Sequence, residues 1–251
     1  MAVSDYAKEE YKMRIMVGKV MLFVLLLASA LLRFSMMASS EEIIFEDEFE
    51  DLNKWGPSGN ISVDDGVLKV RANMAEGTEW SGTDTRELFD DFACYFDLML
   101  VDLTGEGDSS FTFRKAGDKG YYLMFGSYDG GVIDLEHLTT WQQIGACRVN
   151  IPLTSDQEFK VRVVAEADQI IVQIKDAEGN LVVDWDIEDG TYKSGVLHFD
   201  SWKFGELAVT NFVVGTPDYL PEEWGGGPKK LVEPLGKLSN AWGRIKIQPW
   251  L

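Results

Sequence analysis

Hydrophobic and polar residues alternate in short runs between residues 41 and 215, and turn-forming Gly, Asp and Asn residues separate these runs. No stretch of ten residues there has convincing helical periodicity, whereas β-branched and aromatic residues are frequent. The pattern predicts thirteen strands, at residues 43–49, 61–63, 67–71, 92–101, 110–114, 121–125, 132–138, 146–150, 159–165, 169–175, 181–186, 195–199 and 206–214.

Strong turn signals join several of these strands. Asp64 to Gly66 connects two short strands, Asp129 to Gly131 opens another, and Ala177 to Asn180 lies between QIIVQIKD and LVVDWDI as a hairpin loop. Many strands without intervening helices are most economically arranged as two antiparallel sheets packed face to face. We therefore expect an all-β jelly-roll sandwich.

The first forty residues contain an uncharged run of thirteen residues from Val20 to Leu32, preceded by Lys19 and followed by Arg33. A signal-peptide core has about 7–15 apolar residues and a spanning helix about 20, so the length favours an export signal that is cut near Ala38 to Ser40.

An uncleaved membrane anchor is the alternative interpretation of the same segment. A hydrophobic helix from about Met16 to Ala38 would place Lys19 and Arg33 at the two membrane interfaces, with the N-terminus in the cytoplasm. In both cases we expect the following domain to be extracytoplasmic, in the periplasm, at the cell surface or secreted.

The pattern changes again at Pro217. Residues 217–228 are rich in Gly and Pro, and residues 229–251 contain Trp242 and Trp250. We predict a signal peptide or anchor at 1–40, a sandwich domain at 41–216, and a Gly/Pro linker with a C-terminal extension at 217–251. The extension packs on the sandwich through its tryptophans or docks on another protein.

The charge of the chain limits its partners. The formal net charge is −19, and residues 41–216 alone hold −22. Phosphate binding needs clustered Lys and Arg, so we exclude nucleic acid and anionic membrane surfaces as partners of this domain; the membrane is contacted only through an uncleaved N-terminal segment. Cations, neutral glycans and basic proteins are compatible with the charge, and so is a role in solubility alone.

The two cysteines, Cys94 and Cys147, leave two alternatives open. In an exported protein they could form one disulfide. Cys94 also shares a strand face with Phe92, Phe96 and Leu98, which is typical of an unpaired thiol in a hydrophobic core.

Three segments resemble concanavalin A-like, laminin-G-like sandwich domains of bacterial exported proteins. They are FEDEFEDLNKWGPSGNISVDDGVLKV at 45–70, DSSFTFRKAGDKGYYLMF at 108–125 and GVLHFDSWKFGELAVTNFVVG at 195–215. The resemblance covers about 170 residues in the expected order. It implies the fold and only loosely a function, because lectins, glycan-binding modules, adhesion domains and glycoside-cleaving enzymes share this sandwich.

One branch of that resemblance is the group of domains similar to 3-keto-disaccharide hydrolases. Those proteins carry an N-S-G-I-type segment before the Arg strand, and Asp108 to Ser110 stands in its place here. The tail segment GKLSNAWGRIK at 236–246 also resembles a short C-terminal motif of various bacterial exported proteins, which implies no chemistry.

Carboxylates that could catalyse glycoside cleavage are few. Sandwich glucanases use an E-x-D-x-E strand, and here Asp134 and Glu136 supply only the last two members because Val132 occupies the first position. Asp134 and Glu136 are therefore weak catalytic candidates, and a solvated strand face is the default interpretation.

Calcium is the metal that the resemblance favours, since such sandwiches often hold their first and last strands together around one ion. Asp47 in the opening strand and Asn211 in the closing strand occupy matching places for a structural Ca²⁺ site, and oxygen ligands of this kind suit that ion. Ordinary hydrogen bonds of edge or turn residues are the alternative.

Aromatic residues in or beside predicted loops are candidates for sugar binding. They are Trp80, Tyr128, Trp141 and Trp202. Trp141 is the preferred one because Thr139, Thr140, Gln142 and Gln143 flank it, although a single aromatic residue is more often part of a core. His137 and His198 are interpreted as ordinary strand residues, and G-x-S-x-G, HExxH and phosphate-loop motifs are absent from the sequence.

These observations predict an extracytoplasmic binding module for a glycan or an envelope partner protein. A glycoside-cleaving enzyme and a membrane-anchored subunit of an envelope complex are the alternatives.

Overall fold

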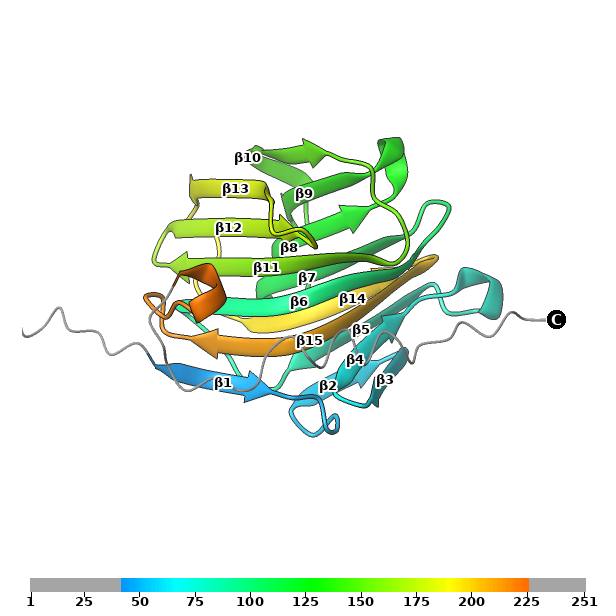
Figure 1. The fold of residues 1–251 in the computed structure, drawn as a ribbon, viewed down its shortest axis with the longest axis horizontal. Coiled ribbons are helices and arrows are strands. Elements are labelled where there is room, and N and C mark those ends of the chain that lie inside the picture. The colour runs from blue at the N-terminus through cyan, green and yellow to red at the C-terminus, as the bar shows by residue number, and fades with distance from the viewer. Residues whose placement is uncertain (1–41, 226–251) are drawn as a thin grey trace, which may run out of the picture. The chain divides into compact units, whose positions relative to one another are not determined.

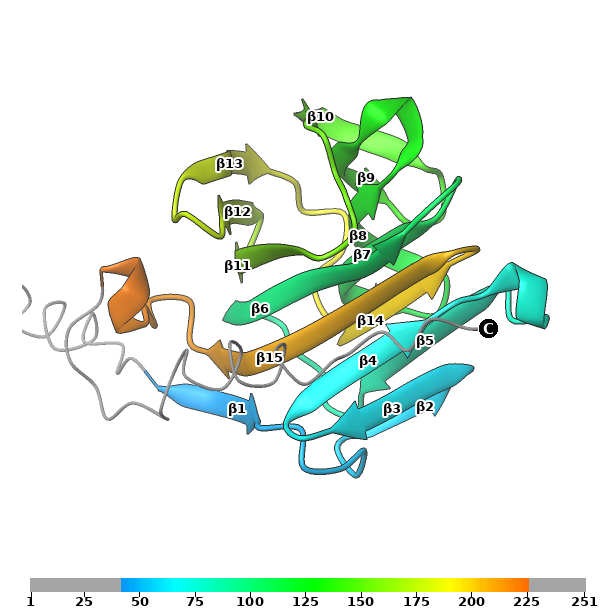
Figure 2. The same cartoon turned by 45° about the vertical axis from the view of Figure 1, so that its right-hand side comes forward.

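The computed structural model describes residues 42–225, which form a sandwich of two antiparallel β-sheets (Figures 1 and 2). Sheet A has eight strands, in the order β13 (Leu181–Glu188), β12 (Gln169–Asp176), β11 (Gln157–Glu166), β6 (Phe92–Leu103), β15 (Gly205–Gly215), β4 (Val67–Arg71) and β3 (Asn60–Asp64), with β1 (Ile43–Asp47) paired to β15. Sheet B has seven strands, in the order β10 (Gln142–Asn150), β9 (Val132–His137), β8 (Lys119–Gly126), β7 (Asp108–Ala116), β14 (Val196–Trp202), β5 (Trp80–Thr85) and β2 (Trp55–Ser58).

The helices of the described residues are three short 3-10 turns, η1 (Met74–Glu76), η2 (Tyr128–Gly130) and η3 (Glu222–Trp224). None of them is long and apolar enough to span a membrane. The predicted N-terminal hydrophobic helix and the extension after residue 225 lie outside the described residues.

The all-β sandwich and all thirteen predicted strands are confirmed, with shifts of a few residues at their ends. Two strands, β2 and β5, were not predicted from the sequence. Pro57 lies in β2, and β5 buries the small polar side chains of Ser81, Thr83 and Thr85, so neither strand has the alternating large apolar residues that indicate a strand.

Aromatic side chains from both sheets fill the space between them. Trp55 is completely buried, and its ring lies 5.4 Å from that of Phe212. Phe96 of sheet A contacts Phe111 and Phe199 of sheet B, with ring centroids 4.8 and 5.1 Å apart. This core excludes water from both inner faces and so fixes which residues of each strand point outward.

Both cysteines are buried free thiols. The disulfide alternative is therefore wrong, and the interpretation of Cys94 as a core residue is confirmed, because Phe92, Phe96 and Leu98 belong to the same buried cluster.

The segment that follows β15 packs on the outer face of sheet A. Tyr219 and Trp224 lie against Tyr95 of β6, with ring centroids 5.7 and 6.4 Å apart. The Lys175 Nζ atom lies 4.1 Å from the centre of the Trp224 ring. The chain from Pro217 to Gly225 therefore belongs to the sandwich, although its composition resembles that of a linker.

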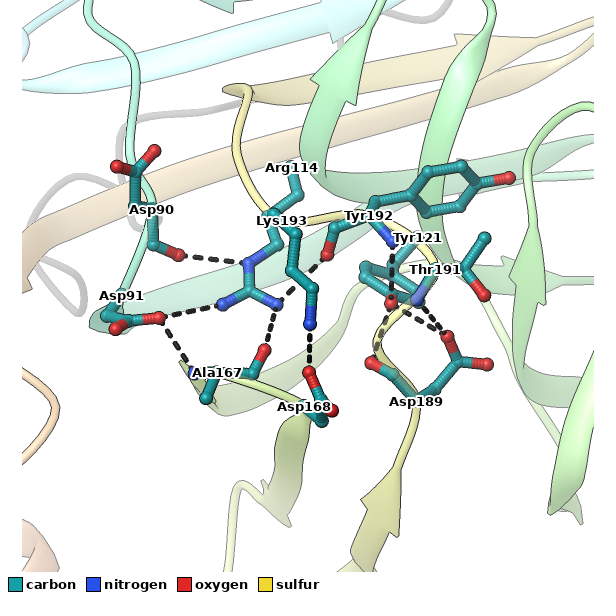
Figure 3. Close-up of polar contacts among 10 residues, drawn as sticks. All are labelled: Asp90, Asp91, Arg114, Tyr121, Ala167, Asp168, Asp189, Thr191, Tyr192 and Lys193. Carbon is teal, nitrogen blue, oxygen red and sulfur yellow. Dashed lines mark hydrogen bonds and ion pairs between the residues drawn. The ribbon is translucent and has the colours of Figure 1, made fainter.

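A buried arginine joins three loops at one end of the sandwich (Figure 3). The Arg114 side chain is fully buried, and its guanidinium donates hydrogen bonds to the backbone oxygens of Asp90, Ala167 and Tyr192 at 2.9–3.1 Å. It also forms an ion pair of 3.0 Å with Asp91. Each of these backbone oxygens belongs to a different loop, so one side chain holds three loops together.

A tyrosine beside this arginine extends the same network. The Tyr121 hydroxyl donates to the backbone oxygen of Asp189 at 2.8 Å and accepts from the Tyr192 backbone N–H at 3.2 Å. Lys193 and Asp168 form an exposed ion pair at the rim (Figure 3). All the partners are residues of the chain itself, so the cluster stabilises the fold.

Candidate functional site

The outer face of sheet B has an unusual composition for the solvent side of a sandwich. Phe111, Phe113, Leu123 and Phe199 point into the core, so the residues between them on the same strands point outward. We call this surface the outer polar face. Its residues are Trp80, Gly82, Asp84, Asp108, Ser110, Thr112, Tyr122, Met124, Asp134, Glu136, His198, Asp200 and Trp202.

Strand register aligns these residues in rows. One row runs from Glu136 through Tyr122, Thr112 and His198 to Asp84. A neighbouring row runs across the same strands. It contains Asp134, Met124, Ser110, Asp200 and Gly82. Neighbouring strands are about 4.8 Å apart, so each row spans roughly 19 Å from β9 to β5.

Trp80 lies flat on this face. Its ring stacks on His198 with centroids 5.8 Å apart and planes 14° apart, and the residue is 43% exposed. The absence of a side chain at Gly82 makes this possible, because a Cβ atom there would lie 2.6 Å from both rings. The strand therefore presents one broad side of an indole to the solvent.

His198 lies between two carboxylates beneath that indole. Its Nδ1 atom is 2.9 Å from Asp84 Oδ1, and its Nε2 atom is 3.0 Å from Asp200 Oδ2. Burial lowers the pKa of His198, but its interactions with Asp200 and Asp84 outweigh that effect and leave the pKa above its usual value. The two carboxylates therefore favour the protonated imidazole.

Asp84 has a second cationic partner in Lys115, whose Nζ atom is 2.8 Å from Asp84 Oδ1. Partial burial raises the pKa of Asp84, while hydrogen bonds from His198 and Lys115 lower it, and the net result is a pKa of about 2. Asp84 is therefore ionised at every physiological pH.

Asp108 is in the opposite situation. It is 8% exposed, and its hydrogen-bond partner is the Tyr122 hydroxyl at 3.2 Å. Burial, followed by repulsion from Asp200, raises the pKa of Asp108 to about 7. A perturbed carboxyl group of this kind is typical of functional sites.

Two further aromatic residues, Trp141 and Tyr128, lie beside the face, and a third, Trp202, belongs to it. Trp141, in the turn between β9 and β10, is 61% exposed and meets Tyr122 edge-on with centroids 5.4 Å apart. Tyr128 covers Gly126, where an added Cβ would lie 2.5 Å from its ring. Trp202 is the cross-strand partner of Trp80. Aromatic rings are thus present near both ends of the rows.

The end of the face near β9 combines charge with unpaired polar atoms. Arg148 forms ion pairs with Asp134 at 3.3 Å and with Asp129 at 3.1 Å. The Glu136 side chain forms no ion pair and no hydrogen bond among residues 42–225; burial raises its pKa, and the more distant charge of Arg148 lowers it. The buried Thr112 Oγ1 atom, in the same row, also lacks a hydrogen-bond partner there.

The structure brings six of the predicted site residues to this one surface or its rim. They are Trp80, Tyr128, Asp134, Glu136, Trp141 and Trp202. In the sequence these residues are candidates for two different chemistries, glycoside cleavage and sugar binding, and nothing there places them on one surface.

The two predicted calcium ligands bind other partners. Both carboxylate oxygens of Asp47 accept hydrogen bonds, from the Phe49 backbone N–H and from the Trp55 indole, each at 2.7 Å. Asn211 donates to Asp97 at 2.6 Å. Within the described part of the chain, no group of three or more His, Cys, Asp and Glu side chains is arranged to hold a metal ion.

Five residues of the candidate site were not predicted from the sequence: Asp84, Asp108, Tyr122, His198 and Asp200. A signal was present, because the core-facing aromatic residues of 110–113 and 198–202 alternate with polar ones. The polar residues form one surface only because their strands are neighbours in sheet B. That surface could not be predicted, because β5, which carries Asp84, was not predicted.

No protein-family model and no curated protein matches this sequence. Several solved structures are similar to this protein in fold. The carbohydrate-binding module CBM66 from Bacillus subtilis is 16% identical, with a TM-score of 0.53, and the match covers 66% of this chain and 98% of that one. The winged bean acidic lectin, complexed with methyl-alpha-D-galactose, is 9% identical with a TM-score of 0.53, over 69% of this chain and 97% of the lectin.

The fold is a concanavalin A-like β-sandwich. A Bacillus subtilis protein of unknown function with a galectin-like fold is also similar, with 14% identity, a TM-score of 0.54 and coverage of 70% of this chain and 98% of that protein. At these identities the likeness establishes the concanavalin A-like architecture alone.

Proposed function

We propose that this protein binds a glycan on the outer polar face of sheet B. The observation that carries the proposal is that the exposed rings of Trp80, on this face, and Trp141, at its rim, accompany carboxylates, hydroxyls and a buried histidine. Sugars have apolar C–H faces and polar rims, so they need aromatic surfaces next to hydrogen-bonding groups.

The matched structures support the proposal. They include a protein titled a carbohydrate-binding module and a lectin complexed with methyl-alpha-D-galactose. The rigid strands of sheet B also fix their outward side chains in place, which reduces the entropy lost on binding.

We further propose that binding takes place outside the cytoplasm. This rests on the uncharged run from Val20 to Leu32, which precedes the sandwich in the sequence. A partner protein of the cell envelope that carries the glycan fits the same proposal.

Glycoside cleavage is the second candidate function, and the state of Asp108 favours it. A carboxyl group with a pKa of about 7 can act as a general acid, and Asp200 on the neighbouring strand lies on the same face. Release of reducing ends by the wild-type protein, lost on Asp108→Asn, would establish it. Tight binding without any release would assign the face to recognition alone.

A glycan array on the full-length protein tests the proposed function. We expect saturable binding that Trp141→Ala weakens at least tenfold, because one stacked ring contributes about 1.5 kcal/mol or more. Leu88→Ala is the matched control, since Leu88 is 73% exposed and lies outside the outer polar face. Equal binding by both variants would contradict the proposal.

A further inference from the structure

We infer that the glycan carries free amino groups, so that the outer polar face selects a cationic amino sugar over its neutral or N-acetylated counterpart. This inference rests on the proposed function and names the class of its ligand. It follows from how the charges on this face are paired.

Among residues 42–225, four cations beside the face, Lys115, Arg148, His198 and Lys203, are each paired with a carboxylate. Lys115 and His198 share Asp84, and His198 also holds Asp200. Arg148 binds Asp134 and Asp129. Lys203 beside Trp202 pairs with Glu106.

Two carboxylates are left without a cation. Neither Asp108 nor Glu136 has an ion pair within residues 42–225. Asp108 is 8% exposed, so water compensates its charge poorly, and the buried Thr112 hydroxyl in the row of Glu136 lacks a hydrogen-bond partner among the described residues. A buried carboxyl group without a paired cation ionises at a cost, and a ligand cation beside it offsets that cost.

Both unpaired carboxylates have an aromatic neighbour on the adjoining strand. Asp108 is the cross-strand partner of Trp202, and Glu136 is that of Tyr122, which contacts Trp141. A ring and a carboxylate side by side suit a sugar with an ammonium group, because the ring contacts the sugar face while the carboxylate binds the ammonium.

The protonation state of Asp108 supplies an independent readout. Its pKa of about 7 means that Asp108 is mostly protonated at pH 6, and a bound ammonium group would lower this pKa. Binding of an amino sugar at pH 6 should therefore release close to one proton.

Calorimetry on the full-length protein tests this inference with two probes, the β-1,4-linked glucosamine tetramer and the N-acetylglucosamine tetramer. At pH 6, we expect the glucosamine tetramer to bind at least tenfold more tightly than the N-acetylglucosamine tetramer, because one charge-assisted hydrogen bond contributes about that much affinity. Titration in buffers of different ionisation enthalpy should show release of about one proton with the glucosamine tetramer and none with the acetylated one.

Variants separate this contact from a general effect of charge. Asp108→Asn should abolish proton release and weaken glucosamine binding about tenfold, and Glu136→Gln, at a more accessible position, should weaken it as well. Glu178→Gln removes one exposed charge from the β12–β13 turn and should change neither quantity.

Equal affinity for the two tetramers, or binding without proton release, would overturn the inference. If neutral glycans bind in a Trp141-dependent manner and the glucosamine tetramer has no advantage, the inference fails and the proposed function stands. If no glycan binds, both fail. If Ca²⁺ stabilises the protein and the glucosamine tetramer does not, the cation that binds Asp108 and Glu136 is a metal ion. That result would also overturn the inference.

Discussion

Trp80 and His198 stack with their ring planes 14° apart, and the histidine is held from its two sides by Asp84 and Asp200. The indole thus rests on an imidazole whose position is fixed by two carboxylates. An aromatic side chain on a strand usually keeps some rotamer freedom, and this arrangement removes much of it.

The His198→Gln variant tests whether the interactions of His198 with Asp84 and Asp200 stabilise the protein. The variant leaves two carboxylates without their shared cation, and we expect a loss of about 3 kcal/mol in the free energy of unfolding at pH 6. Since the pKa of His198 is raised in the folded state, its stabilising contribution is present at low pH and is lost as the pH rises through that pKa. Urea unfolding at pH 6 and pH 9 should therefore show a smaller difference between variant and wild type at pH 9. Equal differences at both pH values would show that His198 is neutral in the folded protein.

Gly82→Ala should displace Trp80 without removing any functional group. A Cβ at this position would lie 2.6 Å from the rings of Trp80 and His198, so the indole must leave its flat position. We expect glycan affinity to fall about tenfold, as for loss of one stacked ring. Gly56→Ala is the matched control on the neighbouring strand β2, where the nearest atom to an added Cβ is 3.8 Å away. Calorimetric affinities that fall equally for both variants would argue against a role for Trp80.

Arg114→Met should destabilise the fold strongly. The change removes hydrogen bonds to three backbone oxygens and the ion pair to Asp91, and we expect a loss of about 3–5 kcal/mol in the free energy of unfolding. Lys193→Met, at the exposed pair with Asp168, should change it by less than about 0.5 kcal/mol. Denaturant unfolding of both variants measures the contrast, and a small effect of Arg114→Met would show that the three loops are held by other contacts.

Asp108 should make stability depend on pH between about 4 and 7. Its pKa is raised in the folded state by burial and then by Asp200, while Tyr122 and Lys203 lower it and Glu136 raises it slightly. The folded protein therefore binds this proton more tightly than the unfolded chain, and stability falls as the pH rises from about 4 to 7. Asp108→Asn removes this dependence and should raise the free energy of unfolding at pH 8 by about 2–4 kcal/mol.

Thermal melts at pH 5 and pH 8 measure this effect, and His198 should give the variant a weaker dependence of the same sign. A wild-type protein that is equally stable at both pH values would contradict the raised pKa of Asp108.

The fold could be predicted from the sequence because the period-two alternation of large apolar residues is a local signal. This signal is absent at β5, where the small polar side chains of Ser81, Thr83 and Thr85 face the core and Gly82 lies under Trp80. The candidate site was predicted only in part, because its residues become neighbours through strand order. Asp108 and His198 are ordinary in the sequence, and only the register of β7 with β14 brings them to one surface.

The location of a bound sugar tests the central claim most directly. We would determine the crystal structure of the full-length protein with the tightest glycan from the array. The account predicts a sugar ring within about 4 Å of the Trp80 or Trp141 ring, on the outer face of sheet B. A glycan bound to the outer face of sheet A or to the end loops, with both tryptophans free, would contradict it.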